Sequence, residues 1–149
     1  MIQYKYFFFH DLKNNLLYEI LRLRSQVFIV EQQCIYQDLD GLDSKAIHVI
    51  ALSGNRVVGH SRIIGKGIKY EEFSSIGRLV LDEEFRGANI GTELMNFSIK
   101  TCLSIYPNVN IKISAQSYLK KFYEKLGFYH NNENYLEDGI QHCSMYLNT

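Results

Sequence analysis

The sequence predicts a single α/β domain, a mixed sheet covered by helices, and three observations lead to that prediction. The chain has 149 residues, which suits one domain and is too short for two. Hydrophobic residues make up 46% of it and charged residues 21%, so it can bury a core without disulfide bonds. Strand-like and helix-like segments alternate, and no Ser-rich or Gly-rich stretch marks a linker. We therefore expect one domain over residues 1–149.

The first half of the chain is expected to contain one helix among four strands. Apolar runs predict the strands over residues 4–9, 47–52, 57–64 and 75–81. The second and third of these runs flank turn residues and form a hairpin. Between the first two runs, four apolar residues have the i, i+4, i+7 and i+11 spacing of a helix with one buried face: Leu16, Ile20, Leu23 and Val27.

The second half is expected to contain two helices and three strands. A charged turn over residues 82–89 precedes a helix that Pro107 closes. The apolar side of this helix carries Ile90, Leu94, Phe97 and Thr101. Alternation over residues 109–113 predicts a strand, and residues 117–126 predict a helix that Gly127 caps. With Phe128 and the alternating residues 143–147 as the last strands, the order is β-α-β-β-β-α-β-α-β-β, an α/β sandwich with a mixed sheet.

Charge and cysteine content exclude several classes of function. Lys plus Arg and Asp plus Glu number 16 each, so no net charge attracts nucleic acid or an anionic membrane. Cys34, Cys102 and Cys143 form no CxxC pair and suit a reducing cytosol, and Cys102 is expected in the core. The five histidines are dispersed and no HExxH motif occurs, so no metal is expected. Apolar runs fall far short of the roughly 20 residues of a spanning helix, and a cytoplasmic protein is expected.

The segment over residues 79–92 is the strongest candidate for a ligand site. A strand turns there through an Arg/Gly stretch directly into a helix, whose unpaired N–H groups and positive end suit a pyrophosphate. Gly87 and Gly91 allow close approach of the ligand, and Arg86 can neutralise its charge. The alternative is an ordinary strand-to-helix connection in which the glycines serve only the turn. Neither GxGxxG nor the phosphate loop of nucleotide hydrolases is present.

Two motifs in this sequence resemble those of the GCN5-related N-acetyltransferase (GNAT) superfamily. The family's pyrophosphate loop reads Arg/Gln-x-x-Gly-x-Gly/Ala at a helix start, and residues 86–91 match it with Asn89 at the first glycine. Asn tolerates unusual backbone angles better than most residues. The second motif is a polar residue after the fifth core strand, followed by a helix ending Tyr-Glu-x-x-Gly-Phe. Here these are Gln116 and residues 123–128.

Five further blocks are similar to those of ElaA-type acetyltransferases within that superfamily. In chain order they fall within residues 24–32, 36–43, 76–78, 115–119 and 137–142. The resemblance implies the GNAT (acyl-CoA N-acyltransferase) fold: a mixed, mostly antiparallel sheet with splayed central parallel strands and helices on both faces. It also implies acetyl-CoA as the acyl donor.

Carried over residue by residue, the resemblance implies a CoA site. Backbone amides of residues 86–91 and the Thr92 hydroxyl would hold the pyrophosphate, and backbone edges at residues 79–81 the pantetheine arm. Gln116 would bond a pantetheine amide. The implied cofactor-binding residues are Leu79, Val80, Leu81, Arg86, Gly87, Ala88, Asn89, Ile90, Gly91, Thr92, Gln116 and Tyr123.

Tyr123 matches the family's general acid. A phenol of reference pKa near 10 can protonate a thiolate of reference pKa about 8.5, so direct transfer needs no covalent enzyme intermediate. The backbone N–H of Leu81 is expected to support the tetrahedral oxyanion. Without the motif, Tyr123 is one of 11 tyrosines and reads as a packed amphipathic side chain.

The proton acceptor is expected in the segment that the fold places over the acceptor side of the cleft. Acids and a histidine in or beside it are candidates: Glu31, Asp38, Asp40, Asp43 and His48. Of these, Glu31 and His48 are the catalytic candidates, while Asp38, Asp40 and Arg24 are the substrate-binding candidates. Alternatively, the acids of residues 36–43 form a solvated turn, and Arg24 is a buried arginine paired with Glu31 or an acid of this loop. His142 fits an exposed strand residue as well as a site residue.

The predicted function is acetyl transfer from acetyl-CoA to a primary amine. The acceptor stays open between a small molecule and a peptide or protein amine, and so does a homodimer paired through the last strands. One alternative is a non-catalytic acyl-CoA sensor of the same fold, favoured by Asn89 in the loop. Another is an acyl-homoserine-lactone synthase, because the pattern Arg24-x-x-Val27-Phe28 resembles the start of those enzymes. That family's N-terminal motif normally includes a tryptophan, and this chain has none.

Overall fold

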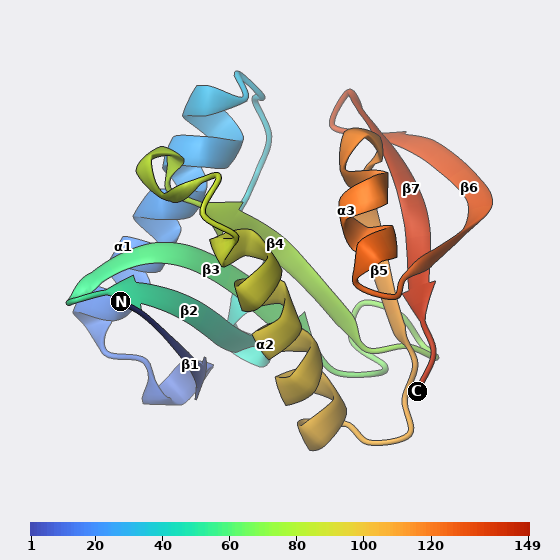
Figure 1. Ribbon diagram of the computed structural model, residues 1–149, viewed down its shortest axis with the longest axis horizontal. Helices are drawn as coiled ribbons and strands as arrows, with labels where there is room; N and C mark the ends of the chain where they lie inside the picture. Colours follow the sequence, from blue (N-terminus) through green and yellow to red (C-terminus); the bar gives the residue numbers. More distant parts are fainter.

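Seven strands and three α-helices follow one another in the computed structural model, which describes residues 1–149 (Figure 1). Their bounds are β1 (Ile2–Phe8), α1 (Asn14–Arg24), β2 (Ile47–Ser53), β3 (Arg56–Ile64), β4 (Ser75–Leu81), α2 (Ile90–Ile105), β5 (Ile111–Gln116), α3 (Lys120–Lys125), β6 (Tyr129–Glu137) and β7 (Ile140–Leu147). The predicted α/β fold and its order of elements are confirmed.

The strands form two antiparallel sheets that touch at one point. The first has the order β1-β2-β3-β4 and the second β5-β7-β6. Ser74 and Ile111 form a single parallel bridge between them, where Ser74 N donates to Asn110 O and Lys112 N donates to Ser74 O. From this bridge β4 and β5 diverge, as Figure 1 shows.

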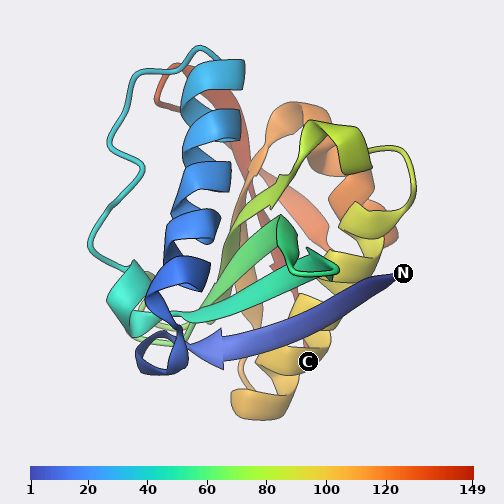
Figure 2. The ribbon, with the colours of Figure 1, turned by 90° about the vertical axis from the view of Figure 1, so that its left-hand side faces the viewer.

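Helices cover both faces of the four-stranded sheet, because its strands are apolar on both sides. Val49 and Ala51 belong to the main core with α2, whereas Ile50 belongs to a smaller core with α1. Figure 2 shows the two helices on opposite sides of the sheet. The main core continues under β5 and β7, so it joins the two sheets. Cys102 lies in it, and burial raises the pKa of this thiol to about 11.

Two helices differ from the regular helices expected. The first changes at Ser25 into a π-helical segment, η2 (Ser25–Glu31), in which Gln32 N donates to Val27 O at 3.0 Å. The last begins as a 3-10 turn, η5 (Ser117–Leu119), before α3, and Gly127 ends it with φ +101°, as expected for a left-handed cap. None of the helices has both the length and the apolar character needed to cross a membrane.

Candidate active site

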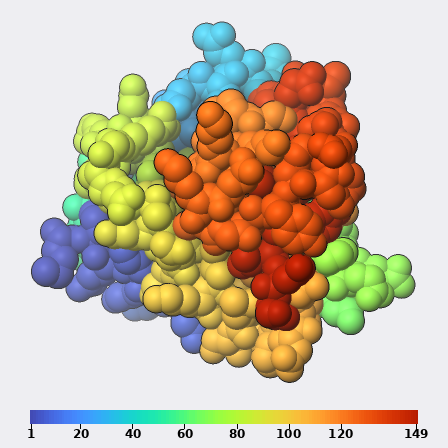
Figure 3. Space-filling model, turned by 45° about the vertical axis from the view of Figure 1, so that its right-hand side comes forward, coloured from blue at the N-terminus to red at the C-terminus, as the bar shows by residue number.

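A cavity of about 470 Å³ occupies the space where β4 and β5 diverge. Its walls come from η2 and the loop after it, from β4, from β5, from the η5–α3 helix and from the β6–β7 hairpin. On the face shown in Figure 3, the start of α2 (yellow-green) and the α3 region (orange) lie next to each other. Arg86 and Gly91 line the cavity from the first region, and Tyr118 and Tyr123 line it from the second. The two motifs singled out in the sequence therefore meet at one cavity.

The edge of β4 that faces this cavity has no strand partner beyond the bridge at Ser74. Asp82 N donates to Val58 O at 2.8 Å. Because neighbouring residues of a strand direct their peptide groups to opposite sides, the peptide groups of Leu81 face the cavity instead of β3. The β4 edge can thus pair with an extended ligand as a further strand would.

A β-bulge shapes the middle of β4. His60 pairs with Val80 and Arg62 with Gly77, so β4 has one residue more than β3 over this stretch. Arg78 lies in the bulge with φ +49°, a left-handed conformation that is uncommon for a side chain-bearing residue. Its guanidinium contacts Asp38 Oδ1 at 2.7 Å and donates to Asp38 O at 2.9 Å.

The loop before α2 has the backbone that an anion site needs. Gly87 has φ +86° and Asn89, which precedes the helix, has φ +65°. Asn89 therefore takes the left-handed conformation that the family's glycine position favours. A Cβ atom on Gly91 would lie 3.3 Å from Leu81 Cδ1, so a larger residue there would press on β4. The first amides of the 16-residue α2 have no acceptor within the helix.

Arg86 is engaged within the protein. It donates to Leu81 O from Nη2 at 2.9 Å, and to Glu31 from Nη1 at 2.7 Å and Nη2 at 3.1 Å. Both side chains are about a third exposed and line the cavity, so the ion pair links η2 to the loop before α2. Glu31, expected as a base, is thus an ion-pair partner of the loop.

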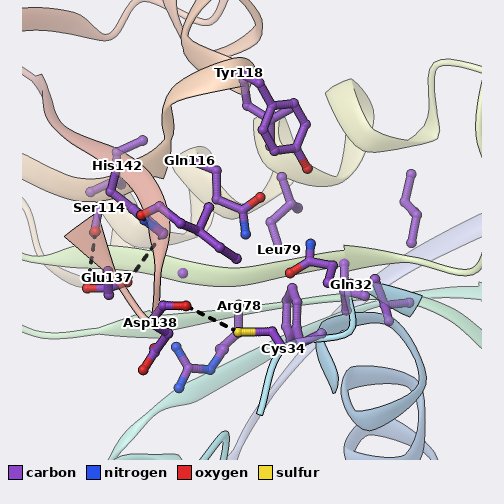
Figure 4. Close-up of a pocket in the computed structure, with 18 of the residues that line it drawn as sticks. Gln32, Cys34, Arg78, Leu79, Ser114, Gln116, Tyr118, Glu137, Asp138 and His142 are labelled. Atoms are coloured by element: carbon purple, nitrogen blue, oxygen red, sulfur yellow. Dashed lines mark hydrogen bonds and ion pairs between the residues drawn. The ribbon is translucent and has the colours of Figure 1, made fainter. Parts of the chain in front are cut away.

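Tyr123 lies in the cavity wall with only 8% of its surface exposed. Phe122 and Phe128 meet its ring edge-on at 5.1 Å and 5.9 Å between centroids. No protein group hydrogen-bonds to its hydroxyl, and burial, with a contribution from Tyr118, raises its pKa above the usual range. Tyr123 therefore remains a protonated phenol at neutral pH, fixed by its aromatic neighbours. Gln116, at the end of β5, lines the same cavity (Figure 4).

Several of the site candidates lie outside the cavity lining. Five belong to the expected pyrophosphate loop and the start of α2: Gly87, Ala88, Asn89, Ile90 and Thr92. Four others are Arg24, Asp38, Asp40 and His48. Arg24 is fully buried and donates to Asp38 Oδ2 at 3.0 Å and to Asp43 Oδ1 at 2.6 Å. Arg24 is therefore a buried structural arginine paired with acids of the loop after η2, the alternative to a substrate-binding role. His48 is fully buried too, with Nε2 2.8 Å from Asp43 O and Nδ1 3.0 Å from His60 Nε2.

These side chains form a buried charge network with two further arginines. Arg62 contacts Asp40 and Asp43, and Arg78 contacts Asp38 and Asp40. Burial acts to raise the pKa of Asp40. The hydrogen bonds from Arg62 and from the Leu42 backbone, with the charges of Arg62 and Arg78, together outweigh burial and hold that pKa below its usual range. The acids thus anchor the loop after η2 to the sheet, which explains why they do not reach the cavity.

Sequence reasoning named residues 137–142 only as a block of resemblance and left His142 open between an exposed strand residue and a site residue. The structure buries His142, with 6% of it exposed, in the C-terminal wall of the cavity. The other residues of this wall are Ser114, Glu137, Asp138 and Ile140. Asp138 and Gly139 have φ +51° and +78°, the conformation of a tight Asp-Gly hairpin turn. That dipeptide between alternating strands was the available signal. The Cys34 thiol donates to Asp138 O at 3.4 Å and ties the hairpin to the loop after η2 (Figure 4).

Comparison with known proteins gives consistent matches over nearly the whole chain. A family profile described as "Acetyltransferase (GNAT) domain" matches residues 16–149. Protein ElaA of Escherichia coli is 35% identical over 147 residues, which cover 97% of this chain and 95% of ElaA.

Solved structures agree. The crystal structure of Escherichia coli ElaA matches with a TM-score of 0.91 at 34% identity, and an acyl-CoA N-acyltransferase from Pseudomonas aeruginosa with 0.92 at 32%. Each match covers 99% of both chains. The AHL synthase LasI matches with a TM-score of 0.78, covering 99% of this chain and 89% of LasI, but at 14% identity this likeness shows the fold alone.

Proposed function

Because the chain belongs to the acetyltransferase (GNAT) family, we propose that it transfers an acetyl group from acetyl-CoA directly to a primary amine. One observation carries the proposal. A single cavity is lined by Arg86 and Gly91 at the two ends of the loop that enters α2, by the unpaired edge of β4 and by Tyr123. These are the parts that hold a pyrophosphate, align an extended pantetheine arm and protonate a leaving thiolate.

The donor is bound by backbone groups in this proposal. The diphosphate accepts hydrogen bonds from the amides of residues 86–91, at the positive end of α2, and from the Thr92 hydroxyl. The pantetheine amides pair with the open edge of β4 at Leu79, two residues before Leu81, and Gln116 bonds one of them from β5. The thioester then lies between β4 and Tyr123.

Direct attack of the amine completes the reaction. The nitrogen lone pair forms a bond to the acetyl carbonyl carbon, and the Leu81 N–H stabilises the oxyanion that develops. The C–S bond then breaks, its electron pair goes to sulfur, and the Tyr123 hydroxyl protonates the thiolate, while the extra proton of the attacking nitrogen restores Tyr123. Tyr123 carries its proton at neutral pH, as a proton donor must, although the burial that raises its pKa also makes it a weaker acid.

Calorimetry of acetyl-CoA binding tests the donor site. We expect saturable binding of acetyl-CoA. Pantetheine, which lacks the diphosphate, should bind more weakly. Absence of acetyl-CoA binding at millimolar concentration would contradict the proposal. Thiol release from acetyl-CoA with a panel of amines separates an enzyme from a non-catalytic sensor, because a sensor binds the donor and releases no thiol.

Tyr123→Phe tests the general acid. We expect kcat to fall about 100-fold, within the range that proton transfer contributes, while the Kd for acetyl-CoA stays within about twofold. Tyr18→Phe is the matched control, because Tyr18 is 67% exposed on α1 and outside the cavity. Unchanged turnover of Tyr123→Phe would remove this residue from the reaction.

A further inference from the structure

The C-terminal sheet presents a polar face to the cavity. His142 on β7 lies opposite Gln116 on β5 and opposite Tyr135 on β6, and Ile140 lies opposite Glu137. Since residues in register share a face of a sheet, His142 and Glu137 lie on the face that carries Gln116, and all three line the cavity. Figure 4 shows Glu137 and His142 next to each other, joined by a dashed line, with Gln116 farther along the cavity.

His142 has its tautomer fixed by the backbone. Its Nδ1 lies 2.7 Å from Ile140 O, and a carbonyl oxygen can only accept, so Nδ1 carries the hydrogen. The lone pair of the neutral ring is then on Nε2. Only 6% of His142 is exposed, so the surrounding residues fix the orientation of its ring.

The nearest acid faces that lone pair. Glu137 Oε2 lies 3.4 Å from His142 Nε2, and no regular hydrogen bond joins them. While the ring is neutral, the carboxylate and the imidazole lone pair are both acceptors. They are satisfied either by a proton taken up on Nε2 or by a donor that lies beside them. An alkylammonium group has three N–H donors and a positive charge, which satisfies both acceptors.

The charge around this point is negative. Glu137 forms no ion pair with Lys or Arg, and neither does Asp138 in the adjoining turn. Arg78, the cation in the opposite wall, is already paired with Asp38 and Asp40. Glu137 and Lys69 form no contact of ion-pair length. Burial lowers the pKa of Lys69, and the charge of Glu137 partly offsets this shift.

We propose that this face is the acceptor subsite: it binds an aliphatic primary ammonium between Glu137 and His142, and His142 Nε2 removes its proton. The inference rests on the proposed function and names its missing base and its substrate class. His142 thereby takes the role for which Glu31 and His48 were candidates, because Glu31 is held by Arg86 and His48 lies outside the cavity.

The protons balance in this scheme. The ammonium gives one proton to His142 Nε2, and the amine lone pair then attacks the carbonyl carbon. As the C–S bond breaks, Tyr123 gives its proton to the sulfur, and the second proton of the attacking nitrogen restores Tyr123. His142 releases its proton to solvent, so the products are the acetamide, CoA thiol and one proton.

Other ionisable groups share this end of the cavity and belong in any interpretation of pH dependence. They are Tyr135 and Glu137 on β6, Asp138 in the turn, Tyr118 in η5, and Cys34 and Arg78 on the opposite wall. Tyr135 stacks on the His142 ring and hydrogen-bonds to Ser114. None of these groups is an imidazole, so replacing His142 removes the only one in the cavity lining.

Acetyl transfer to pentylamine and to 5-aminopentanoate tests the charge preference. We expect kcat/KM at least tenfold higher for pentylamine, because Glu137 and Asp138 repel the carboxylate. In Glu137→Gln the KM for pentylamine should rise about tenfold and the preference should narrow. Equal use of the two amines by the native protein would overturn the subsite.

The pH profile of kcat/KM tests His142. We expect His142→Gln to lower kcat/KM for pentylamine about 100-fold and to abolish the fall in rate on the acidic side, while the Kd for acetyl-CoA is unchanged. His10→Gln is the matched control, since the His10 side chain is 80% exposed. A loss of equal size at every pH, or an unchanged profile, would overturn the assignment.

Amine binding can also be observed without turnover. Titration of pentylamine should shift the imidazole ¹⁵N resonances of His142 and leave those of His10 in place. If acetyl-CoA does not bind but this shift occurs, the proposed function fails and the amine site stands. If acetyl transfer occurs but neither the shift nor the effect of His142→Gln is seen, the subsite fails and the proposed function stands.

Discussion

Arg86 is shared between the fold and the expected ligand. Its guanidinium already has carboxylate and carbonyl acceptors at Glu31 and Leu81, although it begins the pyrophosphate loop. A diphosphate beside this loop would compete with Glu31 for the same donors, and the charge of Glu31 would also repel it. A bound donor therefore has to displace or share the interaction between Arg86 and Glu31.

Glu31→Gln tests this competition. We expect acetyl-CoA to bind up to about fivefold more tightly, since a partly exposed ion pair contributes up to about 1 kcal/mol. The measurement is calorimetry at low ionic strength, where surface charges act most strongly. Glu19→Gln is the matched control, because Glu19 pairs with Arg22 on α1 away from the cavity. Weaker binding by Glu31→Gln would instead assign Glu31 to holding the loop in shape.

At the scale of an element, the start of α2 depends on a left-handed residue at its N-cap. Asn89 adopts this conformation with φ +65° and makes no side-chain cap hydrogen bond. Its role is therefore to supply a backbone angle, which glycine supplies as well and which a β-branched residue resists. The departure from the family's glycine pattern is thus conservative in backbone terms.

Substitutions of Asn89 test this explanation. Asn89→Gly should keep the Kd for acetyl-CoA within about twofold, whereas Asn89→Val should destabilise the fold by about 1–2 kcal/mol and weaken donor binding. Urea unfolding and calorimetry measure the two effects. Equal behaviour of the Gly and Val variants would show that the backbone angle does not matter.

Local patterns predicted the elements and the cofactor motifs, while long-range contacts escaped them. The spacing around Gly127 and the pattern of residues 86–91 depend on neighbours in sequence, so they can be read directly. The bulge at Arg78 depends on Asp38, which is 40 residues away. The position of His142 and Glu137 in the cavity depends on strand register and on the divergence of β4 and β5, which the sequence does not reveal.

For the molecule as a whole, the buried network around Arg24 links stability to pH. His48 and His60 lie at its inner end, stacked at 5.3 Å between ring centroids and fully buried. Burial lowers the pKa of His48 and holds that of His60 well below the usual value, with Arg24 and Arg62 adding to both shifts. Both rings therefore fold in the neutral form.

Stability should fall as pH drops below about 6.5, the ordinary histidine value. The unfolded chain binds these protons more readily than the folded one, so stability is present above that pH and is lost below it. For His60 alone, the loss should approach about 1.4 kcal/mol at pH 5.5. Urea unfolding at pH 7.5 and 5.5 measures it.

His60→Gln should show a smaller loss between these two pH values, and His10→Gln should behave as the native chain does. If His60→Gln kept the full pH dependence, the buried pair would not be its source. A separate loss is expected below about pH 4, because Asp40 and Asp43 have pKa values below their unfolded ones.

The alternation of side chains along β5 and β7 separates residues that pack in the core from residues that line the cavity. Ile113, Ala115, Cys143 and Met145 face the core and hold the two sheets together. Their neighbours Gln116 and His142 face the cavity, and so contribute little to that packing. Under the proposed function, substitutions at these cavity positions change the choice of acceptor and leave the packing between the two sheets intact. If the proposed function holds, chains that keep this core and differ at the cavity positions will share a donor and differ in acceptor.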